Sequence, residues 1–523
     1  MELQADSIGN IYKRIILMKL FNRWYVYPIA ALTISFLPIP VSSEEPVFDV
    51  VLLGGRVIDP ETGLDGIHNV GIAGGTIKAI SKKSLEGLIT EDVSGLVVAP
   101  GFIDLHAHGQ HRVGQQYHVR DGVTTSLDME GGAWPVNRFY RLREGRSLIN
   151  YGATVSYEYL RLELMTGVQS PDLEDTEVNS WDDFYKAVGE EAFNTPVNNK
   201  QLQTLLQEIE KGYSQGALGV GFGIGYFPGA GRKEIYELFK HTSSFDAPIF
   251  IHVRGVLLDK APGGLIATAQ EAISNAAVTG ASMQLVHVAS SGLKDTPIII
   301  EMIEKAQQQG IDITTEVYPY TAFSTNIGAS LFNEGWRRKF QADYSDLQWS
   351  ETGERLTEET FFKYRHEKPG GFVIAHVLPE SAVNYAVAHP IVSIASDGIP
   401  WITGGEHPRG AGTFARVLGR YVRENWVLTL MQALRKMTIM PAQRLEGFAP
   451  SMARKGRVQV GADADIVVFD PDTVIDEATF ANPMQYSSGF KHVLVNGVFV
   501  VKNGGFEKDI FPGKPVQNSH VAQ

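Results

Sequence analysis

The 523-residue sequence contains no cysteine. This absence excludes disulfides, thiolate metal sites, a cysteine nucleophile and a lipidated N-terminal cysteine. Any tightly bound metal must therefore be held by histidine and carboxylate side chains. Basic residues are also outnumbered, with 46 Lys and Arg against 59 Asp and Glu, which gives a formal net charge of −13. Because the sequence also lacks a basic block and an RNP-like motif, we expect no nucleic-acid partner.

Motifs of several common function classes are missing as well. No Gly-x-Ser-x-Gly sequence occurs, which disfavours a serine hydrolase. The glycine-rich run at 216–231 fits neither a dinucleotide-binding fingerprint nor a phosphate-binding P-loop. The composition is that of a globular protein, with 44 % hydrophobic and 20 % charged residues, and it shows no internal repeat. Disordered, collagen-like and coiled-coil proteins are thereby excluded.

The first 44 residues have the pattern of an export signal. A segment with four basic residues precedes an apolar run at 24–41, and small and polar residues follow that run. A membrane anchor is the alternative, but three prolines interrupt the run, which falls short of the ~20 apolar residues of a spanning helix. We therefore expect an exported, periplasmic protein that loses residues 1–44 by cleavage near Ser43 and keeps no membrane anchor.

Short segments rich in β-formers occur at both ends of the remaining chain. They are interrupted by glycine, as is typical of a small sheet domain, and lie at 48–56, 69–81, 97–98, 456–470 and 492–502. We predict that 45–98 and 450–508 pair into one small β-sandwich domain, although two separate units are an alternative. The last residues, 509–523, are predicted to form a loose tail.

The middle of the chain, 99–449, alternates short apolar runs with longer helical patterns. Eight runs are candidate strands: 102–106, 123–127, 153–157, 218–222, 249–253, 284–288, 311–317 and 391–395. Eight such β–α units predict an α/β fold, a (β/α)₈ TIM barrel, with a doubly wound open sheet as the alternative. The stretch 321–390 is too long for a simple connection, so we predict an inserted subdomain or lid there.

The first candidate strand ends in a His-x-His pair. In Pro-Gly-Phe-Ile-Asp-Leu-His-Ala-His at 100–108, His106 and His108 stand two residues apart. Residues i and i+2 of a strand point to the same side, so both imidazoles can hold one ion at the carboxyl end of the strand. Pairs of this kind are also common on protein surfaces, so the motif alone leaves both interpretations open.

Three further metal-competent side chains follow other candidate strands. His252, His287 and Asp397 each come just after a run of apolar or β-branched residues. Singly, each histidine could be a core residue, and Asp397 could cap a helix. The strands of a (β/α)₈ barrel, however, end at one mouth, where active sites are built. Together with the His-x-His pair, these residues predict a site suited to zinc, or to manganese, iron or nickel.

Several longer motifs together resemble those of a known family. They are the segment 100–108 quoted above, Gly-Val-Thr-Thr at 122–125, Tyr-Pro-Tyr at 318–320, Ser-Asp-Gly at 396–398, His-Pro-Arg at 407–409, Met-Thr at 437–438 with Pro-Ala at 441–442, and Gly-Ala-Asp-Ala-Asp-Ile-Val-Val-Phe-Asp at 461–470. Over nearly all of 48–505 the chain resembles the amidohydrolase superfamily, and within it the N-acyl-D-amino-acid deacylases. The resemblance implies a barrel with a β-sandwich from both chain ends, and one or two divalent ions, Zn²⁺ first, that hydrolyse an amide bond of a small N-acyl amino acid.

The resemblance also implies roles for individual residues. It implies that His106 and His108 bind one ion and that His252 and His287 bind the other. It also implies that Asp397 is both a ligand and the proton-handling group. The chain departs from the family at the bridging position, because it has no cysteine there and no lysine in the fourth-strand region 216–226. We predict that Glu130 bridges the ions, with Asp128 as the alternative. A single-ion site and a merely capping Glu130 also stay open.

A deacylase substrate carries a carboxylate, which requires a cation with paired donors. Arg409 and Tyr320 resemble the family's carboxylate contacts, and Arg254 is a weaker candidate. An ordinary salt bridge is the alternative for Arg409. The lysine expected two residues past the sixth-strand histidine is absent, since Ala289 occupies that position.

Two other classes of function remain as alternatives. The same scaffold could hydrolyse cyclic amides, as dihydroorotases and hydantoinases do, or dipeptides. A non-catalytic binding relative that has lost its metal is a third hypothesis, and the full set of four histidines and Asp397 argues against it. The sequence makes no prediction of the oligomeric state.

Overall fold

A computed structural model describes residues 47–172, 180–254, 264–401 and 403–520 of the chain. The predicted export signal at 1–44 lies outside these residues. These described residues form one compact unit. None of the helices among the described residues is long and apolar enough to span a bilayer.

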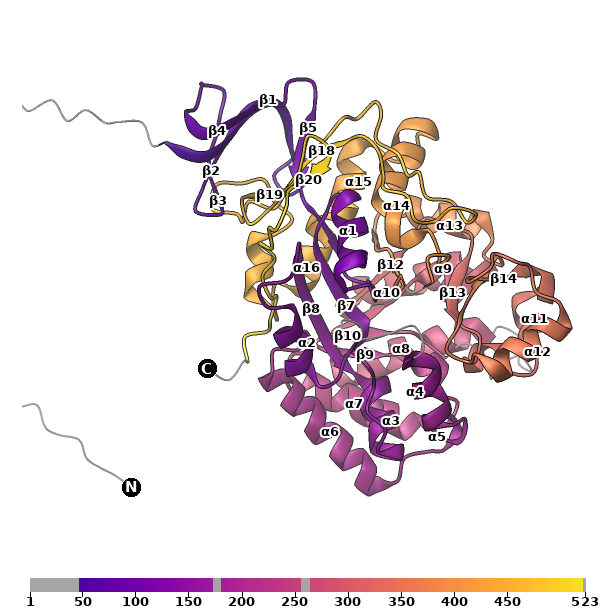
Figure 1. Cartoon of the computed structure of the whole chain (residues 1–523). Coiled ribbons are helices and arrows are strands. Elements are labelled where there is room, and N and C mark those ends of the chain that lie inside the picture. The colour runs from indigo at the N-terminus through magenta and orange to yellow at the C-terminus, as the bar shows by residue number, and fades with distance from the viewer. Residues whose placement is uncertain (1–46, 173–179, 255–263, 402, 521–523) are drawn as a thin grey trace, which may run out of the picture. The chain divides into compact units, whose positions relative to one another are not determined.

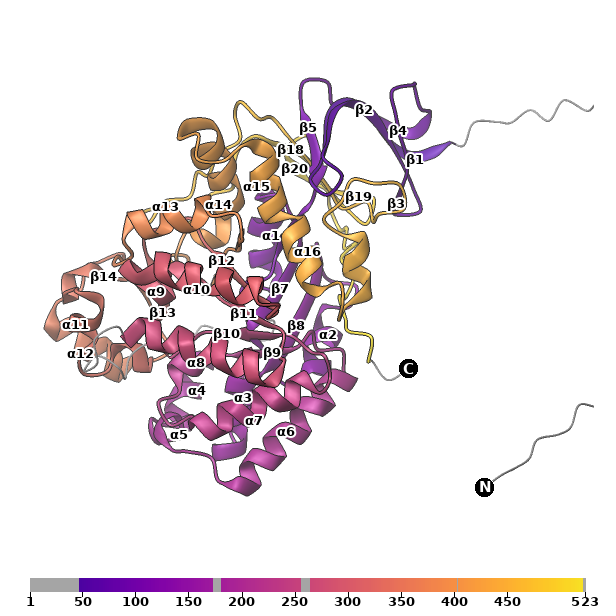
Figure 2. The ribbon, with the colours of Figure 1, turned by 180° about the vertical axis from the view of Figure 1, so that it is seen from behind.

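Eight parallel strands form the barrel at the centre of this unit (Figures 1 and 2). Their order in the sheet is β16-β12-β11-β10-β9-β8-β7-β6, and an isolated parallel bridge between Ala107 and Gly398 joins the segments that follow the two outermost strands. The strands are β6 (Phe102–Asp104), β7 (Val123–Ala133), β8 (Asn150–Ser156), β9 (Val220–Phe222), β10 (Ile249–Ile251), β11 (Met283–Leu285), β12 (Ile313–Val317) and β16 (Val392–Ile394). Each overlaps one of the eight predicted runs, so the predicted (β/α)₈ barrel is confirmed.

Helices alternate with these strands along the chain. Apart from two helices of the inserted segment described below, those between successive strands are α1 (Arg112–Arg120), α2 (Val136–Arg143), α3 (Tyr157–Thr166), α4 (Ser180–Val188), α5 (Glu191–Asn194), α6 (Asn199–Ser214), α7 (Arg232–Ser243), α8 (Gly264–Thr279), α9 (Val288–Gly292), α10 (Thr296–Gln308) and α13 (Glu380–Ala388). The helices α14 (Arg409–Arg416), α15 (Leu430–Met437) and α16 (Ile439–Leu445) follow the last strand. Local sequence sets their ends: Asn198 caps α6 in a capping box with Gln201.

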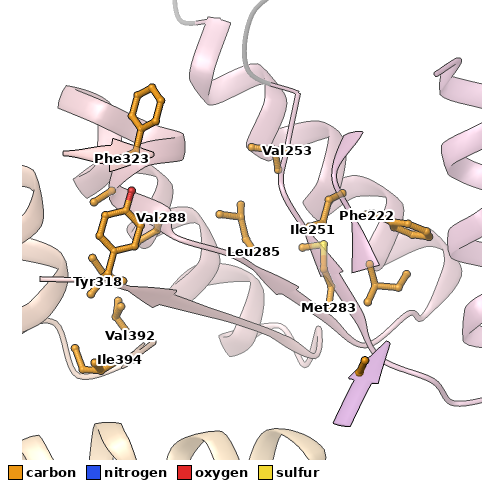
Figure 3. Close-up of a cluster of buried hydrophobic side chains, with 14 of the residues drawn as sticks. Phe222, Ile251, Val253, Met283, Leu285, Val288, Tyr318, Phe323, Val392 and Ile394 are labelled. Carbon is orange, nitrogen blue, oxygen red and sulfur yellow. The ribbon is translucent and has the colours of Figure 1, made fainter. Parts of the chain in front are cut away.

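Alternate residues of the barrel strands belong to different apolar clusters. Ile249 and Ile251 belong to the large cluster that also contains helix side chains such as Leu238, and Figure 3 shows part of this cluster. Phe250, between them, belongs to a second cluster with Leu127 and residues of other barrel strands. Because successive side chains of a strand point to opposite faces, the second cluster fills the barrel interior.

The second sheet is built from both ends of the described chain. Its strands are β1 (Phe48–Asp59), β2 (Leu64–Ala73), β3 (Thr76–Ser81), β4 (Gly87–Asp92), β5 (Val97–Pro100), β17 (Ile466–Phe469), β18 (Phe490–Val495), β19 (Val498–Lys502) and β20 (Gly505–Phe506). Antiparallel pairing of β5 with β17, with Pro100 opposite Ile466, joins the two ends. The predicted small β-domain shared by both chain ends is therefore confirmed.

A third, smaller sheet lies within the segment predicted to be an insertion. It consists of β13 (Phe323–Asn326), β15 (Phe372–Ala375) and β14 (Leu347–Trp349), paired antiparallel in that order. The helices α11 (Trp336–Phe340) and α12 (Glu358–Glu367) lie between its strands along the chain.

The prediction of a loose tail is wrong for the residues just after 512. The backbone of Val516 accepts a hydrogen bond from Tyr140 Oη at 2.7 Å, and its side chain is buried. Asn518 donates to the carbonyl of Tyr213 at 2.9 Å. The sequence pattern missed this because single buried residues between polar neighbours carry no periodicity.

A buried carboxylate, that of Asp465, connects the end sheet with the barrel. One of its oxygens lies 2.8 Å from Lys455 Nζ and accepts a hydrogen bond from Asn150, at the start of β8, at 3.0 Å. The other accepts a hydrogen bond from the backbone N–H of Asn496 at 2.7 Å. The carboxylate therefore satisfies buried donors from both parts of the unit.

We expect Asp465→Ala to lower the free energy of unfolding by about 3 kcal/mol, because it leaves the buried Lys455 ammonium with one carboxylate fewer. The exposed pair Arg56–Asp65, with side chains 46 % and 35 % exposed, provides the control. Asp65→Ala should change stability by less than about 1 kcal/mol. Melting temperatures measured by circular dichroism compare the two variants, and equal shifts would contradict the role of Asp465.

Candidate metal centre

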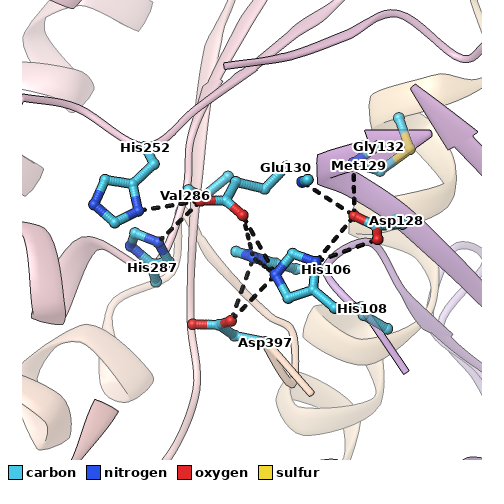
Figure 4. Close-up of polar contacts among 12 residues, drawn as sticks. His106, His108, Asp128, Met129, Glu130, Gly132, His252, Val286, His287 and Asp397 are labelled. Carbon is cyan, nitrogen blue, oxygen red and sulfur yellow. Dashed lines mark hydrogen bonds and ion pairs between the residues drawn. The ribbon is translucent and has the colours of Figure 1, made fainter. Parts of the chain in front are cut away.

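The six predicted metal ligands come from five barrel strands or the residues just after them. His106 and His108 follow β6, Glu130 lies in β7, and the remaining three, His252, His287 and Asp397, follow β10, β11 and β16. Parallel strands of a barrel end at one mouth, and Figure 4 shows these side chains pointing toward one another there. Residues separated by almost 300 positions in the sequence thus form one cluster.

One set of three ligand atoms is formed by His106, His108 and Asp397. The two Nε2 atoms lie 3.2 Å apart. The Oδ1 atom of Asp397 lies 3.4 Å from Nε2 of His106 and 3.6 Å from Nε2 of His108. All three ligand atoms lie within 4.8 Å of one another, close enough for one cation to contact all of them.

Glu130 stands between this set and the other two histidines. Its Oε2 lies 3.3 Å from His108 Nε2 and 3.6 Å from His106 Nε2. Its Oε1 lies 3.1 Å from His252 Nδ1 and 3.9 Å from His287 Nε2. One carboxylate oxygen therefore faces each pair of imidazoles, which is the arrangement of a bridging ligand.

Asp128, the alternative bridge, occupies a different place. Its carboxylate lies 3.1 Å from His108 Nδ1 and accepts hydrogen bonds from the backbone N–H groups of Gly131 and Gly132. Among the described residues, this carboxylate forms no ion pair or hydrogen bond with the other three histidines of the cluster, although the backbone of Asp128 bridges that of His106. Asp128 therefore orients one imidazole, whereas Glu130 lies among all four.

Carboxylates hold the outer ring nitrogens of the His-x-His pair. Glu316 Oε1 lies 2.5 Å from His106 Nδ1, and Gln284 donates to the other oxygen of Glu316. Asp128 does the same for His108. A partner on Nδ1 leaves Nε2 free to face the cluster, as in known metal sites of proteins. Sequence reasoning missed Glu316, although a lone acid within the predicted strand that became β12 was a usable signal.

The electrostatics of the cluster favour a cation. Burial opposes ionisation of Glu130, but its hydrogen bonds with His106 and His108 outweigh this and hold its pKa well below the usual range. Burial likewise opposes ionisation of Asp397, but the charges of Arg409 and His106 lower its pKa. Against its own burial, the pKa of His106 is raised to about 10 by Asp397 and Glu316. The raised pKa of His106 reports the negative charge of the carboxylates around it, and the lowered pKa values of Glu130 and Asp397 show that these carboxylates stay ionised, so a bound cation would balance their charge.

The cluster opens onto a cavity of about 530 Å³, large enough for a small substrate. His252, His287 and Asp397 line its inner end, and aromatic side chains from other elements line much of the rest: Trp134, Phe139, Tyr159, Trp181, Tyr185, Phe193, Tyr226, Tyr318, Phe323 and Phe340. Residues of the third sheet, such as Ser324, also contribute to the wall.

The three predicted carboxylate-binding residues are absent from the described lining of this cavity. Arg409 is 1 % exposed and places Nη2 2.9 Å from Asp397 Oδ1, because the ionised carboxylate attracts it. Arg254 pairs instead with Glu271 at 3.1 Å.

Tyr320, the third of these residues, lies behind the cavity wall. Its ring packs against His407, with centroids 5.2 Å apart, and under the guanidinium of Arg416 at 4.6 Å. Its backbone N–H donates to the carbonyl of Tyr318 at 3.0 Å, so the chain turns tightly between the two tyrosines. Tyr318 therefore lines the cavity in its place, with the guanidinium of Arg409 4.6 Å from its ring centre.

A further acid on the cavity wall, Glu158, was missed from the sequence. It lies in the first turn of α3, just after β8. Burial and the nearby charge of Glu130 raise its pKa well above the usual value. The same strand-end rule that indicated His252 and His287 would have indicated it.

Comparison with known proteins agrees with this geometry. The model of the amidohydrolase family matches residues 255–501. An N-acyl-D-glutamate deacylase of Alcaligenes xylosoxydans xylosoxydans is 30 % identical over 501 residues, covering 86 % of this chain and 93 % of the relative. A D-aminoacylase of the same organism is 29 % identical over 511 residues, covering 89 % and 96 %.

Solved structures show the same relationship. The crystal structure of N-acyl-D-glutamate deacylase from Bordetella bronchiseptica, complexed with zinc and a phosphonate inhibitor, matches with a TM-score of 0.75 at 26 % identity, covering 90 % of this chain and all of that one. At this identity and coverage the chain belongs to the amidohydrolase family and is a metal-binding hydrolase that acts on carbon–nitrogen bonds other than peptide bonds.

Proposed function

We propose that this chain uses zinc to hydrolyse the amide bond of N-acyl-D-amino acids, which releases a carboxylic acid and a free amino acid. The observation that carries the proposal is the position of Glu130, with one oxygen toward each pair of imidazoles at the inner end of the cavity. The names of the deacylase relatives support the choice of substrate class.

The residues present fit a zinc site. Four imidazoles and two carboxylates supply only nitrogen and oxygen donors, a set that zinc accepts, and the outer nitrogens of His106 and His108 are held by carboxylates. His106, His108 and Asp397 would hold one ion and His252 and His287 another, with Glu130 between them. When bound, such ions supply Lewis acidity and lower the pKa of water into the neutral range.

Asp397 is placed to handle protons. Its contacts with His106, His108 and Arg409 all involve Oδ1, and its carboxylate lines the cavity. Its second oxygen, Oδ2, accepts no hydrogen bond from the described residues. Because Arg409 helps to keep the group ionised, Oδ2 can take a proton from an attacking water and then give it to the leaving nitrogen.

We also propose that the protein is exported to the periplasm. The support is the basic segment, the apolar run at 24–41 and the small residues that follow it.

A substrate screen tests the proposed activity. We expect the zinc-loaded protein to release free amino acid from N-acetyl, N-formyl or N-succinyl D-amino acids faster than from their L-forms, measured with a stereospecific amino-acid assay. Asp397→Asn should lower kcat by 10²–10⁴-fold, the usual range for general acid–base catalysis, while metal stays bound. Turnover of cyclic amides or dipeptides without turnover of N-acyl amino acids would refute the proposal.

Metal analysis tests the two carboxylates of β7 against each other. Glu130→Ala should lose at least half of the zinc that the wild-type protein retains after dialysis, because both imidazole pairs lose a shared ligand. Asp128→Asn should keep a zinc site weakened by 10–100-fold, as expected for an orienting partner. Mass spectrometry gives the zinc content, and circular dichroism checks that both variants fold. Full retention in Glu130→Ala would rule out the bridge.

N-terminal sequencing tests export. The protein expressed from the whole sequence and recovered from the periplasmic fraction should begin near residue 44 or 45, because the signal is removed by cleavage. Lys13→Asp with Arg14→Asp should reduce the processed fraction, since the basic flank is part of the signal. A protein that retains residues before 40 would contradict this.

A further inference from the structure

Lys339 is a cation on the cavity wall, distant in sequence from the metal cluster. It belongs to α11, between the strands of the third sheet, and lines the same cavity as His252 and Asp397. Its ammonium lies 4.4 Å from the centre of the Phe340 ring. No carboxylate among the described residues forms an ion pair with it. The half-buried ammonium therefore contacts an aromatic ring and has no counter-ion among the described residues.

The other cations of the wall are already engaged or exposed. Arg143 pairs with Asp172, with Nη2 and Oδ1 3.6 Å apart. Arg365 donates to the carbonyl of Ile327 at 3.0 Å and to further oxygens nearby. Lys186 is exposed to solvent. Lys339 is thus the half-buried cation of the described wall whose charged group forms neither an ion pair nor a hydrogen bond with the described residues.

An unbalanced ammonium in such a place has a physical cost. Removing a charge from water is unfavourable unless an opposite charge compensates it. Burial lowers the pKa of Lys339 to about 7, in agreement with the missing counter-ion. A carboxylate that enters the cavity would restore the balance, so the position is complementary to an anionic ligand.

A continuous wall connects Lys339 with the metal cluster. Arg409, beside Asp397, donates to the carbonyl of Ser324 at 3.4 Å. The neighbouring Phe323, which Figure 3 shows near Tyr318, packs against Phe340 with ring centroids 5.2 Å apart. Lys339 and the metal cluster therefore line one shared cavity, at the two ends of this wall.

The usual cations for a substrate carboxylate are displaced in this chain. Ala289 stands where a lysine was expected, and Arg409 is engaged with Asp397. An N-acyl amino acid nevertheless carries at least one carboxylate that must enter the cavity. The substrate carboxylate therefore lacks its expected partners near the metal cluster. Lys339, further along the cavity wall, is a cation that could bind it instead.

We propose that Lys339 binds a carboxylate of the substrate and thereby determines which N-acyl amino acids the enzyme accepts. The proposal rests on the proposed deacylase function. Three carboxylates share this chemistry: the α-carboxylate, an acidic side chain and the free acid of a dicarboxylic acyl group. In each case the ammonium is a binding group remote from the amide bond, so its removal raises KM more than it lowers kcat.

Kinetics of Lys339→Met test the proposal, with Lys339→Arg as the charge-conserving variant. We expect Lys339→Met to raise KM for the affected carboxylate substrates by 10–100-fold, the scale of a lost charge-assisted hydrogen bond. Lys339→Arg, which keeps the positive charge, should raise KM by less. Arg337→Met is the matched control: it removes a cation from the same helix that pairs with Asp343 at 3.0 Å outside the cavity. Zinc content should be equal in all variants.

The substrate panel separates the three sources of the carboxylate. A higher KM of Lys339→Met for N-acetyl-D-glutamate but not for N-acetyl-D-glutamine shows that Lys339 binds the acidic side chain. A higher KM for N-succinyl but not for N-acetyl derivatives shows that it binds the free acid of the acyl group. An equal increase in KM for every substrate of the panel shows that Lys339 binds the α-carboxylate. An unchanged KM for every substrate, or an equal effect of Arg337→Met, would overturn the role of Lys339.

Binding measurements keep this test independent of the proposed activity. If the wild-type protein hydrolyses none of the panel, the deacylase proposal fails, and calorimetric titration with N-acetyl-D-glutamate and N-succinyl-D-alanine still tests Lys339. Weaker binding to Lys339→Met than to the wild type supports carboxylate recognition. Equal affinity, or no binding to either protein, overturns it.

Discussion

The negative field at the barrel mouth is the constraint on which the rest of the site depends. Glu130 and Asp397 are buried with their ionised oxygens directed at imidazoles, and Glu316 and Asp128 are directed at the outer nitrogens of two of them. Four carboxylates in so small a volume repel one another, and the protein compensates with Arg409 and with a pocket for a cation. The barrel strands serve this arrangement, because they bring the charged residues together from distant positions and hold them against rigid β-structure.

Much of this arrangement could be predicted from the sequence because its signals are local. Each barrel strand is a short apolar run, and a metal-competent residue just after such a run must face the mouth once the parallel topology is assumed. His252 and His287, each of which alone could be a core residue, gained their significance from this convergence. The bridging ligand was harder to predict, because two residues of the same parity in one strand look alike in sequence. The choice between Glu130 and Asp128 depends on the twist of β7 and on where it bends. The structure separates them by giving Asp128 the backbone N–H groups of the following glycines.

The failures had equally specific causes. Tyr320 was expected in the cavity and lies behind it, because a tight turn after Tyr318 separates two side chains that simple alternation would place together. Arg409 was assigned to the substrate and instead contacts Asp397, an interaction between residues 12 positions apart that only the folded loop reveals. Val516 and Asn518 pack against the barrel as isolated residues, and an isolated buried residue leaves no period to detect.

These displacements are related. When an arginine neutralises a carboxylate of the metal cluster, it stabilises the ionised form, but its charge is no longer fully available to a ligand. The cavity of a deacylase must then draw its attraction for an anionic substrate from elsewhere. The third sheet supplies a wall that reaches the cavity, and α11 on that wall carries Lys339 among aromatic rings, where few groups compete for its charge. Separation of the two tasks has a chemical consequence: the cation that maintains the ionised carboxylate stays fixed near the amide bond, and the cation that selects the substrate can differ between relatives without disturbing the metal cluster.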